Sequence, residues 1–152
     1  GVMRFILMVW LLMFSTQVGA QEFKSLESVM ENSPAATYPF VRCGGMYQAM
    51  MERIGYERMG GEAWSQNDEA RSALLVFGGL MLSDQLPNTS QQEIGKITAN
   101  DARRIADIYE QRMNSNFALT GEAFFSDNLI KSDLNFCKRL SEEVIPIIRN
   151  LK

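Results

Sequence analysis

The side chains that most often perform chemistry are sparse in this chain, and histidine is missing from its sequence altogether. Without imidazole, neither a Ser-His-Asp triad nor a Cys-His pair can form. The E-x-x-H pattern of di-iron bundles and a Cys/His zinc site are excluded for the same reason. The sequence also lacks an S-x-x-K pair, a G-x-S-x-G elbow, a P-loop and a dinucleotide fingerprint. We therefore predict no catalytic residue, no metal ligand and no cofactor.

Carboxylates are the remaining groups that could support hydrolysis. A glycosidase needs two acids about 5 to 10 Å apart. The candidates are Glu52 with Glu57, which follow the apolar stripe of one helix, and Asp84, which follows a long apolar run. Acids at helix ends more often cap the helix or face water. A carboxylate-based hydrolase is thus the weakest of three functional hypotheses.

Three methionines, Met46, Met50 and Met51, cluster on one expected helix. Thioethers bind Cu(I), fill irregular gaps in cores and form adaptable binding grooves. Core packing is the interpretation that needs the fewest assumptions. The alternative function that follows from this cluster is a carrier of an apolar ligand or a metal in a Met-rich interior.

The chain has two cysteines, Cys43 and Cys137, and each falls on the apolar stripe of its helix. An even pair in an exported chain is typical of one disulfide, because extracellular compartments are oxidising. We therefore predict a bridge that links the second helix to the last. Two buried free thiols are the alternative, as in many cytosolic proteins.

The amino-terminal residues predict export. Arg4 is the only charge among the first twenty residues, residues 5–14 are apolar without interruption, and small residues occur at Val18 and Ala20. This order is typical of a signal peptide, so we expect residues 1–20 to be cleaved and residues 21–152 to form one helical domain. A transmembrane anchor would need about 20 apolar residues, and a buried core helix is the other alternative. The expected location is periplasmic or secreted, with no stable membrane anchor after cleavage.

Apolar residues recur at steps of three and four along the whole mature chain, and the two-residue period of strands is absent. The fold class is therefore all-α, a single-domain bundle of about four to five helices. Ser65, Ser90 and Asp127 (or Ser126) are the expected helix caps. The expected helices cover residues 22–32, 40–59, 65–86, 90–117 and 127–151.

Two glycine pairs interrupt these helices, Gly44 with Gly45 and Gly78 with Gly79. Each glycine costs a helix interior about 1 kcal/mol relative to alanine, so close approach of another backbone should compensate. We predict that the helix of Cys43 crosses the 65–86 helix near both pairs. Residues 73–82 are apolar on every side, which predicts a helix buried on all faces.

Aromatic residues and one arginine are the candidates for an interaction surface, because such residues mark protein interfaces. They lie at three places along the chain: Tyr38, Phe40 and Arg42; Tyr56 and Trp64; Phe124 and Phe125. Their alternative role is to seal the core across helix ends.

The formal charge of −3, without a basic stripe, excludes nucleic acid as a partner. The leading hypothesis is a small exported, non-catalytic protein-interaction module, of the inhibitor, immunity or assembly-factor type, whose partner is another protein.

Overall fold

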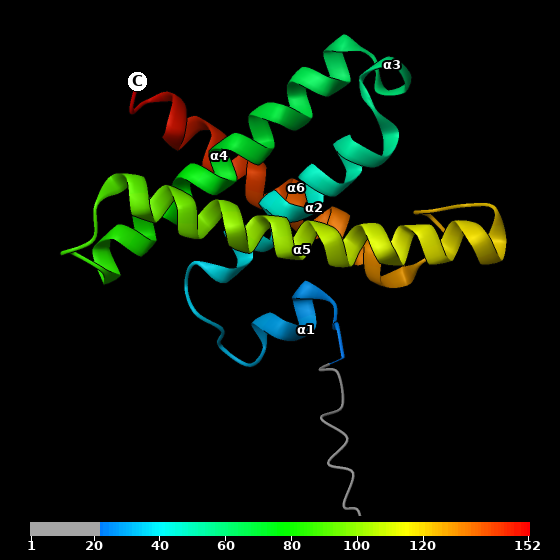
Figure 1. The fold of residues 1–152 in the computed structure, drawn as a ribbon, viewed down its shortest axis with the longest axis horizontal. Coiled ribbons are helices and arrows are strands. Elements are labelled where there is room, and N and C mark those ends of the chain that lie inside the picture. Colours follow the sequence, from blue (N-terminus) through cyan, green and yellow to red (C-terminus); the bar gives the residue numbers. More distant parts are fainter. Residues whose placement is uncertain (1–21) are drawn as a thin grey trace, which may run out of the picture.

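The computed structural model describes residues 22–152, which form six helices and no strand (Figure 1). The helices are α1 (Leu26–Met30), α2 (Tyr38–Ile54), α3 (Tyr56–Met59), α4 (Gly61–Gln85), α5 (Gln91–Thr120) and α6 (Asn128–Arg149). The all-α fold class is confirmed. The predicted signal peptide, residues 1–20, lies outside the described residues. None of the helices within residues 22–152 is both long and apolar enough to cross a bilayer.

Helix α2 occupies the centre of the bundle. It packs against α5 on one side and α4 on another, and α6 packs mainly against α4. Figure 1 shows α5 as the long helix that runs across the molecule, with α4 oblique to it and α1 below it. The fully buried side chains gather between these helices and include Cys43, Met46, Leu74, Met113 and Ile130.

A disulfide joins Cys43 in α2 to Cys137 in α6, as predicted. Both residues are buried, and their Cα atoms lie 5.3 Å apart. The bridge closes a loop across a sequence separation of 94 residues. The chain-entropy model assigns a loop of that length about 4 to 5 kcal/mol of stabilisation.

The two glycine pairs each face two different helices. A Cβ on Gly44 would collide with the side chain of Leu75 in α4, and one on Gly45 would lie 2.8 Å from the carbonyl oxygen of Ala102 in α5. Gly78 faces the beginning of α2, whereas Gly79 faces α5. Gly44 and Gly78 therefore lie in the contact between α2 and α4, and the other glycine of each pair lies against α5.

Two of the predicted N-terminal caps are present, one at the start of α5 and one at the start of α6. The Ser90 hydroxyl accepts a hydrogen bond from the amide of Glu93 at the start of α5. Asp127 accepts from two backbone amides in the first turn of α6. Burial opposes ionisation of Asp127, but Arg112 and Asn116 outweigh it and hold the pKa of this carboxyl at about 2.

Three predictions about the helices were wrong in detail. The second predicted helix is divided at Gly55, which has a φ of 78°. The residues after it form the separate short helix α3, so the number of helices is six. Helix α4 begins at Gly61, so Ser65 lies inside the helix and does not cap it. In its first turn Trp64 packs against Tyr56, with the two ring centroids 5.6 Å apart. Helix α1 begins only at Leu26, because residues 22–25 are extended.

The prediction that residues 73–82 are buried on all faces was also wrong. Val76 is 49% exposed and Leu80 is 41% exposed. Helix α4 packs against α2, α5 and α6, which leave one stripe of it, with Val76 and Leu80 four residues apart, open to solvent. A continuous apolar run does not distinguish a central helix from an outer one.

The glycine contacts predict opposite effects on stability for two glycine-to-alanine substitutions, each inside a helix. In Gly45→Ala the new methyl meets the backbone oxygen of Ala102, which cannot move aside easily, so we expect a loss of about 1 to 3 kcal/mol. In Gly95→Ala nothing lies within 4 Å of the new methyl, so helix propensity should stabilise α5 by about 0.5 to 1 kcal/mol. Urea denaturation of the two variants measures both, and equal effects would contradict this account.

Candidate functional site

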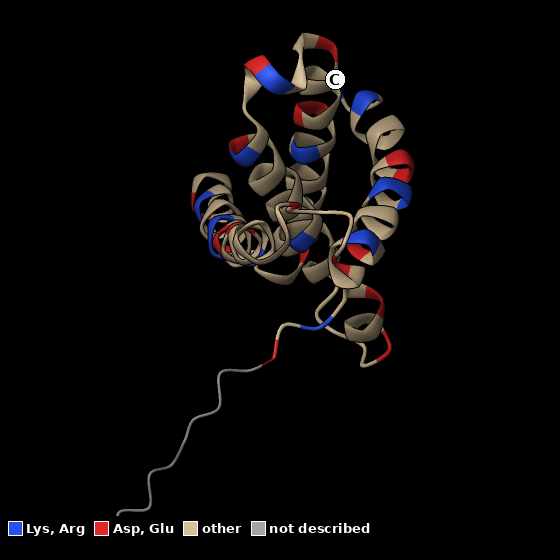
Figure 2. Cartoon of the chain, turned by 90° about the vertical axis from the view of Figure 1, so that its right-hand side faces the viewer, with Lys and Arg blue, Asp and Glu red and all other residues tan. Residues whose placement is uncertain are grey.

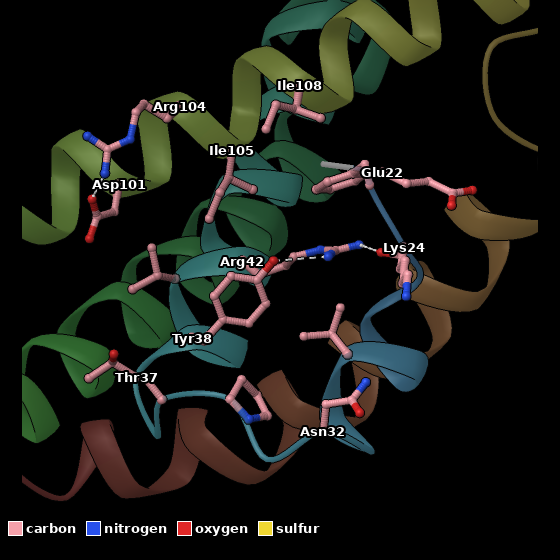
Figure 3. A pocket seen from close by; sticks show the side chains of 15 residues that line it. Glu22, Lys24, Asn32, Thr37, Tyr38, Arg42, Asp101, Arg104, Ile105 and Ile108 are labelled. Carbon is pink, nitrogen blue, oxygen red and sulfur yellow. Dashed lines mark hydrogen bonds and ion pairs between the residues drawn. The ribbon is translucent and has the colours of Figure 1, made fainter. Parts of the chain in front are cut away.

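A groove of about 1090 Å³, open to solvent on one side, lies between residues 22–37 and helices α2 and α5 (Figure 3). More than half of its lining residues belong to residues 22–37, which we call the arm, and the others come from α2 and α5. The lining residues are Glu22, Phe23, Lys24, Val29, Asn32, Pro34, Ala35 and Thr37 of the arm, Tyr38, Val41 and Arg42 of α2, and Asp101, Arg104, Ile105 and Ile108 of α5.

The groove exists because α1, within the arm, stays away from α5. The arm contains α1, which packs against α2 and α6, but no Cα atom of α1 lies within 8 Å of one in α5. The space between them is floored by the first turns of α2. The position of the arm therefore decides the width of the groove.

A buried ion pair between Arg42 and Asp133 holds the arm in this position. The Nη2 atom of Arg42 lies 2.6 Å from Oδ2 of Asp133, and the two side chains are 1% and 0% exposed. Tyr109 donates a hydrogen bond to the same carboxylate oxygen at 2.6 Å and accepts one from Nε of Arg42 at 2.8 Å. The three residues come from α2, α5 and α6, so the pair ties three helices together.

The same two charged groups bind the arm through its backbone. Arg42 Nη2 donates to the carbonyl oxygen of Lys24 at 2.6 Å, and the amide of Leu26 donates to Oδ1 of Asp133 at 2.7 Å. The Phe23 ring lies over the guanidinium, 3.9 Å from its centre, and meets the Tyr109 ring edge-on at 5.1 Å. These contacts keep residues 22–25 extended, which explains the late start of α1.

Both tyrosine and arginine keep their ordinary charge states in this cluster. Burial raises the pKa of Tyr109 well above its usual range, so its hydroxyl remains a neutral donor. Burial alone would lower the pKa of Arg42, but Tyr109 and Asp133 outweigh it and the pKa lies above its ordinary value. The cluster is therefore a neutral, fully hydrogen-bonded unit that anchors structure and offers no nucleophile.

The predicted surface residues do not form one surface. Tyr38 lines the groove, but Arg42 was wrongly expected at the surface, because its guanidinium is paired with Asp133 and covered by Phe23. Phe40 is partly buried and stacks with Phe77 of α4 at 4.7 Å.

The remaining predicted surface aromatics lie elsewhere. Tyr56, which is 59% exposed, packs on Trp64 at the corner between α3 and α4. Phe125 is 70% exposed before α6, whereas Phe124 packs against the core. The structure thus places the seven candidates at separate sites, and only Tyr38 and Arg42 touch the groove.

An exposed carboxylate cluster bridges α2 and α5 outside the groove. Arg103 donates to both oxygens of Glu52, at 2.6 and 2.9 Å, and also contacts Asp107 and Glu110. Hydrogen bonding to Arg103 lowers the pKa of Glu52 to about 2. Burial and the neighbouring Glu52 raise the pKa of Glu110 to about 7.

Opposed pKa values are what a two-carboxylate hydrolase requires. Here, however, both oxygens of Glu52 are occupied by Arg103, and Glu52 borders only a small pocket of about 210 Å³. Glu57, the other carboxylate of the predicted pair, belongs to α3, and Asp84, the alternative candidate, lies at the end of α4. We interpret the cluster as an ion network between helices.

The methionines do not form one site: several lie in or against the core, and Met30 is exposed. Met46 and Met113 are fully buried there, and no methionine lines the groove. In the described part of the chain, no three Cys, Asp or Glu side chains gather in a way that could hold a metal ion. Figure 2 shows acidic and basic residues interspersed along the helices, without a face of one sign in that view.

Sequence reasoning did not identify Asp133 or Tyr109 as members of a site. The available signal was a charged residue at an apolar position: Asp133 lies three residues after Ile130 and four before Cys137, both buried. A carboxylate with that spacing faces the core and requires a partner there.

Loss of Asp133 should destabilise the protein strongly. In Asp133→Ala the Arg42 guanidinium stays buried without its counter-charge, so we expect a loss of about 3 to 5 kcal/mol and release of the arm. The exposed pair of Asp107 with Arg103 provides the control, because Asp107→Ala should cost about 1 kcal/mol or less. Urea denaturation measures both variants, and hydrogen exchange of residues 22–30 reports the arm. Equal losses would contradict the anchoring role.

The raised pKa of Glu110 predicts a pH dependence of stability. Between its ordinary value of 4.5 and about 7, folded Glu110 holds a proton that the unfolded chain has released. The folded state binds more protons in this window, so the free energy of unfolding should fall as pH rises through it. Glu110→Gln should flatten the dependence of the melting temperature on pH across this window. Glu143→Gln, at an exposed position of α6, should leave that dependence unchanged. A flat profile in the unaltered protein would refute the coupling.

Comparisons of the chain with protein families, with curated proteins and with solved structures found no match.

Proposed function

We propose that this protein is a small exported, non-catalytic interaction module that binds a segment of another protein in the groove between its arm and α5. The observation that carries the proposal is the groove itself. It has a volume of about 1090 Å³, and its walls combine apolar side chains with a charged rim. Interfaces commonly have this composition, an apolar centre inside a polar edge.

Export is part of the proposal. It is supported by the amino-terminal pattern of residues 1–20 and by the Cys43–Cys137 disulfide, since such bridges persist in oxidising compartments. The candidate roles of such a periplasmic or secreted module are inhibitor, immunity-type factor and assembly factor. All three act by surface complementarity and need no reactive side chain.

The chemistry around the groove supports binding rather than catalysis. Its buried polar groups, Arg42 and Asp133, satisfy each other and the arm backbone. Asp101 and Arg104 on the opposite wall pair with each other.

Photo-crosslinking tests the proposal. Ile108 lines the groove and is 40% exposed, whereas Leu119, on the same helix, is 85% exposed and lies outside the groove. With benzoylphenylalanine at either position, we expect a discrete protein adduct from position 108 and none from position 119 in the native exported fraction. Unlabelled protein should compete for that adduct, and Ile108→Glu should not.

Two outcomes would contradict the proposed function. Absence of a competed protein adduct at position 108 would reject a protein partner in the groove. An adduct of small mass, from a co-purifying apolar compound, would favour the carrier hypothesis instead.

A further inference from the structure

The disulfide lies where α2 meets α6, and two other helices cover this contact. Cys43 and Cys137 are 0% and 1% exposed. Among the helices of residues 22–152, only α4 and α1 pack against both α2 and α6, and α4 and α1 do not contact each other. They therefore cover the contact from different sides. Helix α4 has 25 residues, whereas α1, in the arm, has five.

The arm is attached directly beside the disulfide. Its backbone is bound by Arg42, which precedes one of the two cysteines, and by Asp133, which lies four residues before the other. Four residues are about one helical turn, so both attachment points adjoin the bridge. Leu26 of the arm is fully buried and belongs to the same core cluster as both cysteines. Release of the arm would therefore open the core on the side of the disulfide.

Release of the arm requires far less disruption than unfolding of the protein. Leu26 is the only buried residue among residues 22–37. When the arm leaves, Arg42 and Asp133 lose their bonds to its backbone but retain their ion pair and their bonds to Tyr109. Proteins open locally at such weakly buried segments much more often than they unfold globally.

The link between α1 and α2 contains a strained residue. Ser33 has a φ of 48°, which is uncommon for a residue with a side chain, and it is exposed. Such a conformation persists only while the surrounding structure holds it. Release of the arm would let Ser33 relax, so the link favours opening and provides a hinge next to Pro34.

We propose that the arm is a gate over the Cys43–Cys137 disulfide, which a dithiol reductant reaches only while the arm is released. One thiolate of the dithiol attacks a cysteine Sγ, and the S–S bond breaks with its electron pair going to the other cysteine sulfur. The second thiolate of the dithiol then displaces the first cysteine from the mixed disulfide. The dithiol is oxidised to a disulfide, and its two thiol protons end on Cys43 and Cys137.

The gate goes beyond the proposed function, because it does not depend on what the groove binds. Formation of the bridge by the reverse reaction passes through the same open state. Reduction removes the covalent bond between α6 and α2, whose first turns form the floor of the groove. The position of the arm therefore controls whether the bond that orients α2 can be made or broken.

The rate of reduction tests the gate. The disulfide-bonded protein is treated with excess dithiothreitol at a fixed pH, and free thiols are alkylated and counted by mass. Phe23→Ala removes the ring that lies over the Arg42 guanidinium, so we expect reduction about 5- to 30-fold faster than in the unaltered protein. Lys24→Ala is the matched control, because it retains the backbone carbonyl that Arg42 binds and should leave the rate unchanged. Equal rates in the Phe23→Ala variant and the unaltered protein would overturn the proposal.

A second measurement separates release of the arm from global unfolding. Local opening exposes little surface, so the rate of reduction should not change at low urea concentrations, whereas a global route accelerates from the first addition. Ile94→Ala, at a buried position of α5 beside Gly79 of α4, weakens the fold away from the arm and should leave the rate without urea unchanged. Acceleration by low urea in the unaltered protein, or equal acceleration by Ile94→Ala and Phe23→Ala, would assign reduction to global unfolding and reject the gate.

Discussion

The ion pair between Arg42 and Asp133 is the interaction on which the arrangement of this protein depends. Both groups are withdrawn from water, and the attraction between two such charges repays their desolvation only when every remaining hydrogen-bonding position is filled. Here Tyr109, Tyr38, the Lys24 carbonyl and the Leu26 amide supply these further hydrogen bonds. The pair can form only when α2, α5, α6 and the arm are all in place. It therefore specifies one arrangement of these elements, beyond whatever stability it adds.

The disulfide and the ion pair act on neighbouring residues of the same helix. Cys43 follows Arg42 directly, so α2 is joined to α6 by a covalent bond and by a charged contact within one turn. The bridge stabilises the fold mainly by restricting the unfolded chain, whereas the ion pair distinguishes between folded arrangements. Together they orient α2, whose first turns form the floor of the groove.

The groove is a consequence of how the arm is attached. The arm is held at one end by the charged pair and at the other by its continuation into α2, and between these points it spans a space that α5 does not fill. A domain that needed only stability would close such a space, because buried apolar area is the main source of folding free energy. The proposed binding of a partner segment would use this unfilled space.

The sequence by itself determined the local structure. Apolar spacing predicted the all-α fold, Ser90 and Asp127 marked helix starts, and the apolar positions of Cys43 and Cys137 indicated their bridge. These features depend on residues within a few turns of each other or on a cysteine pair with no competing partner. Only the tertiary structure decided that Arg42 meets Asp133, 91 residues away, that α4 lies outside α2, and that the arm leaves a groove beside α5. Periodicity states which face of a helix is apolar, but not which helix covers it, and the groove is made by that choice.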